Sequence, residues 1–222
     1  MLKKMGFVII LLLSAVLGIS AIVRYFILDP VEGNAILIRE GMTMFRMNNQ
    51  LWSIALYIHI ITAAIPLVLG PFLFIKKLRN LHLQVHRNLG RVYVLMILTS
   101  SIVGIYLSFY AHGGILAILG FIGLDLTWLY TTYKAYKYIR KKHLVLHEEW
   151  MYRSYAVTFA ALTFRMWSAI IGYSIDNFTV GYVVAIWLSW IGNLIAIELW
   201  IRMNLRKGKK RLSKGLTEEV TH

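Results

Sequence analysis

The 222-residue chain contains no cysteine and little charge. The absence of cysteine excludes disulfides, thiolate metal sites, iron–sulfur clusters and cysteine nucleophiles. Charged residues make up only 15% of the chain and hydrophobic residues 59%, whereas an ordinary soluble domain carries roughly 25% charged residues. A chain of this size cannot bury so much apolar surface, so a soluble globular fold is excluded. Only 3 prolines occur, and with so apolar a composition this excludes a disordered or collagen-like chain.

Six stretches are long and apolar enough to cross a bilayer, for which a helix needs about 20 residues. In lipid, each backbone polar group must be satisfied within its own segment, so stretches of this length are helical. The sequence therefore predicts an all-α integral membrane six-helix bundle, in one transmembrane domain over residues 1–205 followed by a polar, mobile basic tail over 206–222. The predicted spans are residues 5–24, 51–74, 91–110, 114–133, 150–173 and 181–201.

The first span also resembles a secretory signal peptide, because Lys3 and Lys4 precede its apolar run. That run, about 20 residues, is long for a signal peptide. No convincing cleavage site lies between Ala15 and Ala21. A retained first helix is therefore predicted.

Lysine and arginine indicate the orientation. With the N-terminus inside, most of the 24 basic residues fall on inner segments, and only Arg24, Arg39 and Arg46 lie on outer ones. Both termini are therefore predicted to be cytoplasmic, in a bacterial plasma membrane. This distribution accounts for the formal charge of +14 through attraction to anionic lipid headgroups. Nucleic-acid binding is not predicted, because the basic residues are divided among short segments rather than gathered on one face.

Placing a charged or imidazole side chain at bilayer depth costs a few kcal/mol, so each such residue needs a structural or functional explanation. At about 1.5 Å per helical residue, they sort into two layers. The outer layer holds His59, His112, Asp125 and Arg165, and the inner layer holds His86, Arg91, His147, Arg153 and Glu198. The structural interpretation of the charges is pairing between helices, Asp125 with Arg165 and Glu198 with Arg153.

The histidines form pairs by depth. His86 and His147 open helices 3 and 5 at the inner side, and His59 and His112 lie on the outer half. A lone histidine on a spanning helix is more often a hydrogen-bonding residue, whereas such a pair can approach one metal from opposite sides. Haem b in a helix bundle takes one imidazole from each of two facing helices, with arginines neutralising its propionates. The arginines suited to this are Arg87, Arg91 and Arg153 for an inner haem and Arg165 for an outer one, and the glycines that would admit a flat macrocycle are Gly90 and Gly104.

Two other interpretations stay open. His82-x-x-x-His86 and His143-x-x-x-His147 each place two imidazoles on one helical face. With Glu148 or Glu149 they would form a zinc or iron site at the cytoplasmic face, although His82 and His143 also suit solvated basic loops. Alternatively, His59, Asp125 and Arg165 form the polar binding site or proton relay of a carrier, channel or assembly factor without a redox centre.

Two motifs carry a resemblance. The run His86-Arg-Asn-Leu-Gly-Arg-Val-Tyr93 and the run from His147 through Trp150-Met-Tyr-Arg-Ser-Tyr155 to Arg165 resemble a family of uncharacterised bacterial multi-pass membrane proteins, a domain of unknown function. That family also shows a helix-2 histidine followed by Gly-Pro, matched by His59 and Gly70-Pro71. The resemblance covers roughly residues 50–200.

More remotely, the arrangement is similar to the di-haem cytochrome b561 class. This resemblance implies a core of helices 2–5, with one haem between helices 2 and 4 and another between helices 3 and 5. His59 with His112, and His86 with His147, would fit that plan. The chain departs from it at His112, which lies at a turn beside Gly113 and Gly114 rather than inside helix 4, so the outer haem has either a different second ligand or none.

Together these patterns favour a haem-b-binding membrane oxidoreductase or electron-transfer protein, passing electrons across the bilayer or to a quinone. His86 and His147 are the expected axial ligands and His59 the outer ligand, with Arg91, Arg153 and Arg165 as charge partners. Expected partners are the lipid bilayer and a quinone or redox partner, and a homodimer is left open.

Overall fold

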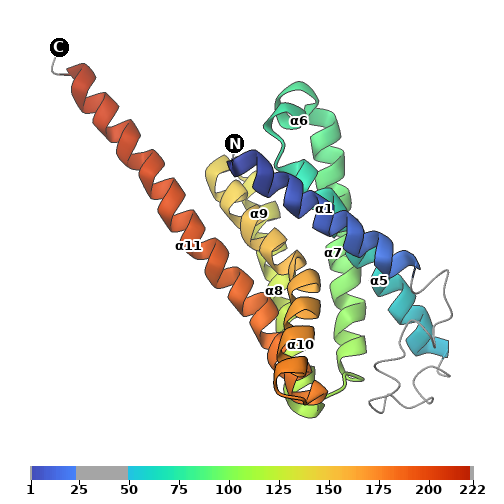
Figure 1. Ribbon diagram of the computed structural model, residues 1–222. Coiled ribbons are helices and arrows are strands. Elements are labelled where there is room, and N and C mark those ends of the chain that lie inside the picture. The colour runs from blue at the N-terminus through green and yellow to red at the C-terminus, as the bar shows by residue number, and fades with distance from the viewer. Residues whose placement is uncertain (1, 24–49, 221–222) are drawn as a thin grey trace.

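The computed structural model describes residues 2–23 and 50–220, with side chains over 9–20, 23 and 50–204, and all regular structure in those parts is helical (Figure 1). The predicted outer-loop residues Arg24, Arg39 and Arg46 lie outside the described residues, as do the side chains of the basic tail. The helices are α1 (Leu2–Ile22), α5 (Gln50–Leu73), α6 (Lys76–Leu81), α7 (Leu83–Ser108), α8 (Gly114–Arg140), α9 (Leu144–Thr158), α10 (Ala160–Ser174) and α11 (Phe178–Val220).

Within the described residues, 5 helical segments are long and apolar enough to cross a membrane, while α1 contributes a shorter apolar stretch, Ile9–Ser20. The five segments are Gln50–Leu73, Leu83–Ser108, Gly114–Arg140, Leu144–Ser174 and Phe178–Asn204. They coincide with the last five predicted spans, although most extend beyond the predicted bounds. The protein is thus a multi-pass membrane helical bundle.

The fourth segment consists of α9 and α10, which meet at Phe159. At the end of the fifth, α11 continues as a helix to Val220, through residues predicted to form a polar tail. Lysine, arginine and leucine dominate this stretch and are good helix formers, and no proline interrupts them. The apolar pattern therefore predicts where the membrane-spanning part of α11 ends, but it does not predict where the helix itself ends.

Four segments form the central ring of the bundle. Helix α5 packs against α7, α7 against α8, α8 against α9, and α9 closes the ring on α5. Consecutive spans run in opposite directions, so α7 and α9 occupy opposite corners and run parallel. Outside the ring, α11 packs on α8, α9 and α10, and α1 lies on α5 (Figure 1). Side chains at the same level of α7 and α9 can therefore meet across the centre.

Glycines allow the closest helix contacts, as expected where lipid supplies no hydrophobic drive for association. A Cβ placed on Gly181 of α11 would lie 2.5 Å from the Cα of Gly172 on α10. A Cβ on Gly120 of α8 would lie 2.6 Å from the side chain of Ile186 on α11. At the first contact the two helices approach backbone to backbone, and at the second a side chain of α11 lies against the backbone of α8, so a side chain in place of either glycine would clash.

Helix α5 contains Pro71 in its last turn. Proline has no N–H, so the carbonyl of Leu67, four residues earlier, lacks its helical partner. The hydroxyl of Tyr155 on α9 donates a hydrogen bond to this carbonyl over 3.1 Å, and Ser14 of α1 bonds the same hydroxyl at 3.0 Å. The aromatic ring reaches the carbonyl because it occupies the space that a side chain on Gly70 would fill. The Gly70-Pro71 pair thus joins α1, α5 and α9.

This junction predicts the effect of Gly70→Ala. An added methyl group would overlap the ring of Tyr155 and displace its hydroxyl from Leu67, which should lower the free energy of unfolding by about 2 kcal/mol. The matched control is Gly90→Ala, also within a helix, because a Cβ there meets no atom within 4 Å. Thermal unfolding of the two purified variants in detergent measures their melting temperatures. Equal melting temperatures would contradict the packing described for Gly70.

Candidate functional site

The two inner histidines lie at matching levels of the bundle. Tyr93 of α7 and Ser154 of α9 are hydrogen-bonded through their hydroxyls, 3.0 Å apart, across the centre of the ring. His86 precedes Tyr93 by seven residues, and His147 precedes Ser154 by the same number. Seven residues are about two helical turns, so on each parallel helix the histidine lies on the same face as the bridging hydroxyl. His86 and His147, here called the histidine pair, therefore share one level on facing sides of α7 and α9.

The hydrogen bonds of the histidine pair are unequal. The Nδ1–H of His147 donates to the carbonyl of Ala135 on α8 over 2.9 Å, which leaves Nε2 with its lone pair. The Nδ1 of His86 is buried and has no hydrogen-bond partner among the described residues. The two imidazoles are near enough to act on one another electrostatically. A buried ring nitrogen without a partner is unusual in a folded protein.

Arg79 of the short helix α6 completes this end of the bundle. Its guanidinium acts electrostatically on both members of the histidine pair and forms an ion pair of 3.8 Å with Glu148. Sequence reasoning missed Arg79, because it sits in a basic inter-helix segment with no motif around it. Only the packing of α6 against α7 brings it to the histidine pair.

The other histidines of this end are exposed. His82 and His143 are the N-cap residues of α7 and α9, and the ring of His143 lies edge-on to Tyr138 at 6.3 Å. Within the described residues, no group of three or more His, Cys, Asp or Glu side chains is placed to hold a metal ion.

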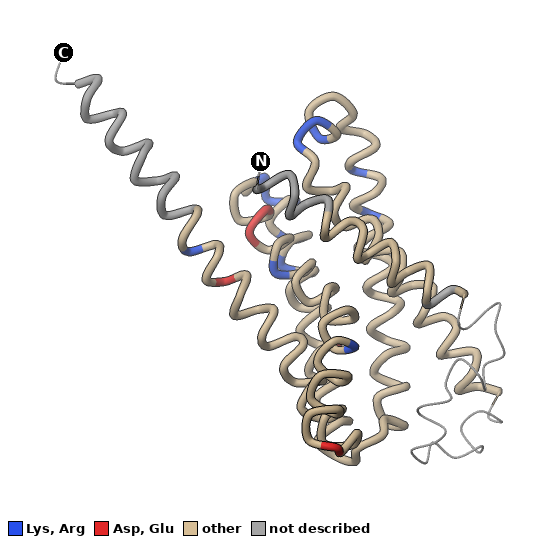
Figure 2. The backbone as a smooth tube through the Cα atoms, in the orientation of Figure 1, with Lys and Arg blue, Asp and Glu red and all other residues tan. Residues whose placement is uncertain are grey.

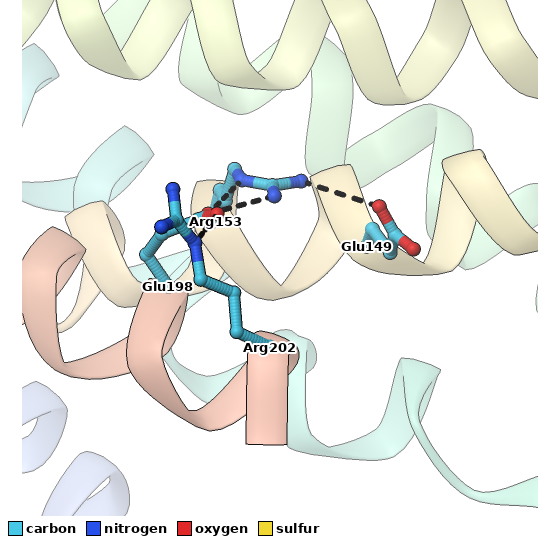
Figure 3. Close-up of polar contacts among 4 residues, drawn as sticks. All are labelled: Glu149, Arg153, Glu198 and Arg202. Atoms are coloured by element: carbon cyan, nitrogen blue, oxygen red, sulfur yellow. Dashed lines mark hydrogen bonds and ion pairs between the residues drawn. The ribbon is translucent and has the colours of Figure 1, made fainter. Parts of the chain in front are cut away.

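The predicted pair between Glu198 and Arg153 is formed. Nη2 and Nε of Arg153 on α9 donate to Oε2 of Glu198 on α11, at 2.7 Å and 3.0 Å. Glu149 and Arg202 extend this pair into a network of four charges (Figure 3). The guanidinium of Arg153 therefore points toward α11, where Glu198 binds it. Of the other predicted arginines at this end, Arg91 is exposed and bonds Asn88 at 3.3 Å.

A network of buried hydroxyls fills the middle of the ring. Tyr93 also bonds the hydroxyl of Thr158 at 3.1 Å, and the indole N–H of Trp128 donates to that same oxygen over 2.8 Å. Thr132 of α8 bonds Ser154 at 2.7 Å. Sequence reasoning did not identify this network, since single Ser and Thr residues in apolar helices carry no motif. It binds α7, α8 and α9 together between the inner and outer polar layers.

The outer histidines are bound to different helices. The Nδ1–H of His59 on α5 donates to the carbonyl of Ser100 on α7 over 3.0 Å. His112 bonds the hydroxyl of Thr179 on α11 at 2.9 Å, with its ring edge-on to Tyr182. The two imidazoles thus turn toward α7 and α11 respectively. Arg165 of α10 lies near enough to His59 to act on it electrostatically.

Asp125 of α8 is buried, with 4% of its surface exposed. The predicted pair with Arg165 is not formed: Asp125 faces α7, whereas Nη1 of Arg165 donates to the carbonyl of Ala161 on its own helix over 2.6 Å. A Cβ on Gly104 of α7 would lie 2.6 Å from Oδ2 of Asp125. The carboxyl therefore fills the space at Gly104 in which a macrocycle was expected, while the space at Gly90 is open.

The hydroxyl network predicts that Ser154→Ala destabilises the bundle. Tyr93 and Thr132 each lose a buried hydrogen-bond partner, which should cost about 1–2 kcal/mol. Ser168→Ala is the control, because Ser168 bonds only a carbonyl of its own helix on an exposed surface. Thermal unfolding in detergent compares the two variants, and a Ser154→Ala protein as stable as the control would show that the network contributes little.

The comparisons with known proteins identify one relative group. The family described as "Predicted membrane protein (DUF2306)" matches residues 56–201, a region that contains both sequence motifs, the Gly70-Pro71 pair and the histidine pair. No curated protein matches the chain, and no solved structure does. Because the match covers well over half of the residues, the chain belongs to the DUF2306 family of predicted membrane proteins.

Proposed function

We propose that this membrane protein binds haem b between α7 and α9, through His86 and His147, and carries single electrons. The observation that carries the proposal is the shared level of the histidine pair, seven residues below a hydrogen bond that fixes α7 against α9. His86 and His147, on facing helices, would hold the haem iron through their imidazole nitrogens. A bound haem b supplies reversible one-electron chemistry.

The surroundings of the histidine pair fit this group. The Ala135 carbonyl holds the His147 ring by its Nδ1, which is the usual arrangement for a metal-ligating imidazole. The unpartnered Nδ1 of His86 leaves that ring ready for a ligand. Arg79, rather than the predicted Arg153, is the cation near both rings, and it would neutralise a propionate. The open space at Gly90 leaves room beside α7.

Residues around the histidine pair would influence the properties of a bound haem. The bond from Ala135 raises the basicity of His147 as a ligand and fixes its orientation. The hydroxyl network around Tyr93 closes the bundle above the histidine pair. A dry surrounding on that side would limit solvent access and so help to set the reduction potential of a bound haem. A quinone or a soluble redox partner would exchange electrons at that end.

Haem binding predicts a coloured protein. When the protein is expressed with haem supplementation and purified in detergent, it should show a Soret absorption band, which His86→Ala and His147→Ala should each abolish with folding retained. His82→Ala is the matched control, because His82 is exposed at an N-cap, and it should keep the band. A colourless wild-type protein, or variants that all stay equally coloured, would overturn the proposal.

Orientation in the membrane forms part of the proposal. Lys and Arg gather at the end of the bundle that carries α6 and the α8–α9 turn, called the basic end (Figure 2). By the positive-inside rule, this end faces the cytoplasm of a bacterial plasma membrane, as do both termini. The haem would then lie near the cytoplasmic side.

Cysteine labelling tests this orientation, since the natural chain has no cysteine to interfere. Ile175→Cys, exposed in the α10–α11 turn, should react in whole cells with a membrane-impermeant maleimide. Lys141→Cys, exposed in the α8–α9 turn, should react only after the cells are opened. The reverse pattern would place the basic end outside.

A second candidate function is a carrier or channel without a redox centre, as the buried Asp125 favours. Under that function, the Soret measurement gives a colourless wild-type protein, and the double change His86→Ala with His147→Ala leaves its spectrum unaltered. The two candidates are thus separated by one spectrum.

A further inference from the structure

We propose that Asp125 and Ser101 form a proton-binding site inside the bundle, from which a proton exchanges with the end of α7 opposite the basic end. The proposal goes beyond electron transfer and does not depend on bound haem. It begins from two buried polar side chains, on α8 and α7, that the haem proposal leaves unused.

The carboxyl of Asp125 has no compensating charge. Only 4% of its surface is exposed, and it forms no hydrogen bond or ion pair with any residue whose side chain is described (9–20, 23 and 50–204). An ionised carboxylate without a partner at bilayer depth is costly. The carboxylate of Asp125 must therefore be neutralised by a bound cation, and we take that cation to be a proton.

Ser101 provides the second observation. Its hydroxyl is fully buried on α7 and has no hydrogen-bond partner in the described part of the chain. It lies about one turn from Gly104, against which the carboxyl of Asp125 packs, with Oδ2 2.6 Å from the position of a Cβ. A hydroxyl can donate to a carboxylate and accept from a carboxylic acid, so it suits both states of a titrating carboxyl.

A metal ion suits the place less well than a proton does. Divalent cations take about six oxygen ligands, whereas the side chains here offer one carboxyl and one hydroxyl. Of the ionisable groups on the helices packed against α8, Tyr93 bonds Ser154, His147 bonds Ala135, and Arg153 bonds Glu198, while His86 lies at the basic end, about five turns of α7 away from Gly104. None of these groups is bound to Asp125.

The exchange route follows one face of α7. Ser101, Gly104 and Ser108 lie on this face at helical spacing, and Ser108 is buried within the last turn, where its hydroxyl donates to the carbonyl of Gly104 over 2.8 Å. Beyond Ser108 the helix ends and the chain turns toward α8. In this route the Ser108 hydroxyl accepts a proton on one side, releases its own proton on the other, and then rotates back, so that a proton passes between Asp125 and that turn.

Infrared spectroscopy of the full-length protein in lipid nanodiscs at neutral pH tests the site. The wild type should show a carboxylic-acid C=O stretching band that disappears in the nearly isosteric Asp125→Asn. Transfer to D2O should shift the band, because the proton exchanges. Loss of the Ser101 hydroxyl in Ser101→Ala should move its frequency. If Asp125→Asn removes no such band, the carboxyl is ionised and the proposal is wrong.

The route has its own control. Ser108→Ala should slow the D2O shift of the band severalfold, whereas Ser189→Ala should not, because Ser189 is an equally buried serine on α11 that bonds its own helix. Equal exchange rates in these two variants would overturn the route, and a band that never shifts in D2O would overturn the exchange. The wild-type measurement needs no variant to fold, and none of these spectra requires haem.

Discussion

One hydrogen bond sets the register of the bundle. Tyr93 and Ser154 are fully buried at opposite corners of the ring, where no water can replace the hydrogen bond between them. Their bond therefore fixes the relative height of two parallel helices that share few direct backbone contacts. The levels of His86 and His147 follow from it. If α7 slid by one turn past α9, the bond and the histidine level would be lost together.

The second constraint is the break in α5. Proline within a helix normally leaves a carbonyl unsatisfied, and in lipid no water is present to satisfy it. Here a tyrosine from another helix supplies the bond, and the adjacent glycine provides room for its ring. Gly70, Pro71 and Tyr155 thus act together, although Tyr155 lies 84 positions after Pro71 in the chain. This gives a structural reason for both the Gly-Pro pair and the second tyrosine of the His147 motif.

Much of the architecture was predictable from the sequence because the bilayer enforces it. A long apolar segment must be a helix, so the last five spans followed from hydropathy. The Arg153–Glu198 pair was predictable, since few opposite charges exist at that depth. The Asp125–Arg165 pair was not formed, because depth gives the level of a side chain and not the direction in which its helix face points. Arg79 and the hydroxyl network depend on packing angles, which hydropathy does not contain.

The close contact of Gly172 with Gly181 has a mechanical consequence. Where two helices touch through their backbones, no side chains lie between them that could change rotamer and let them slide. Helices α10 and α11 should therefore move together as one rigid unit. Thr179, in the first turn of α11, is hydrogen-bonded to His112. Any tilt of the α10–α11 unit would therefore be transmitted to the start of α8.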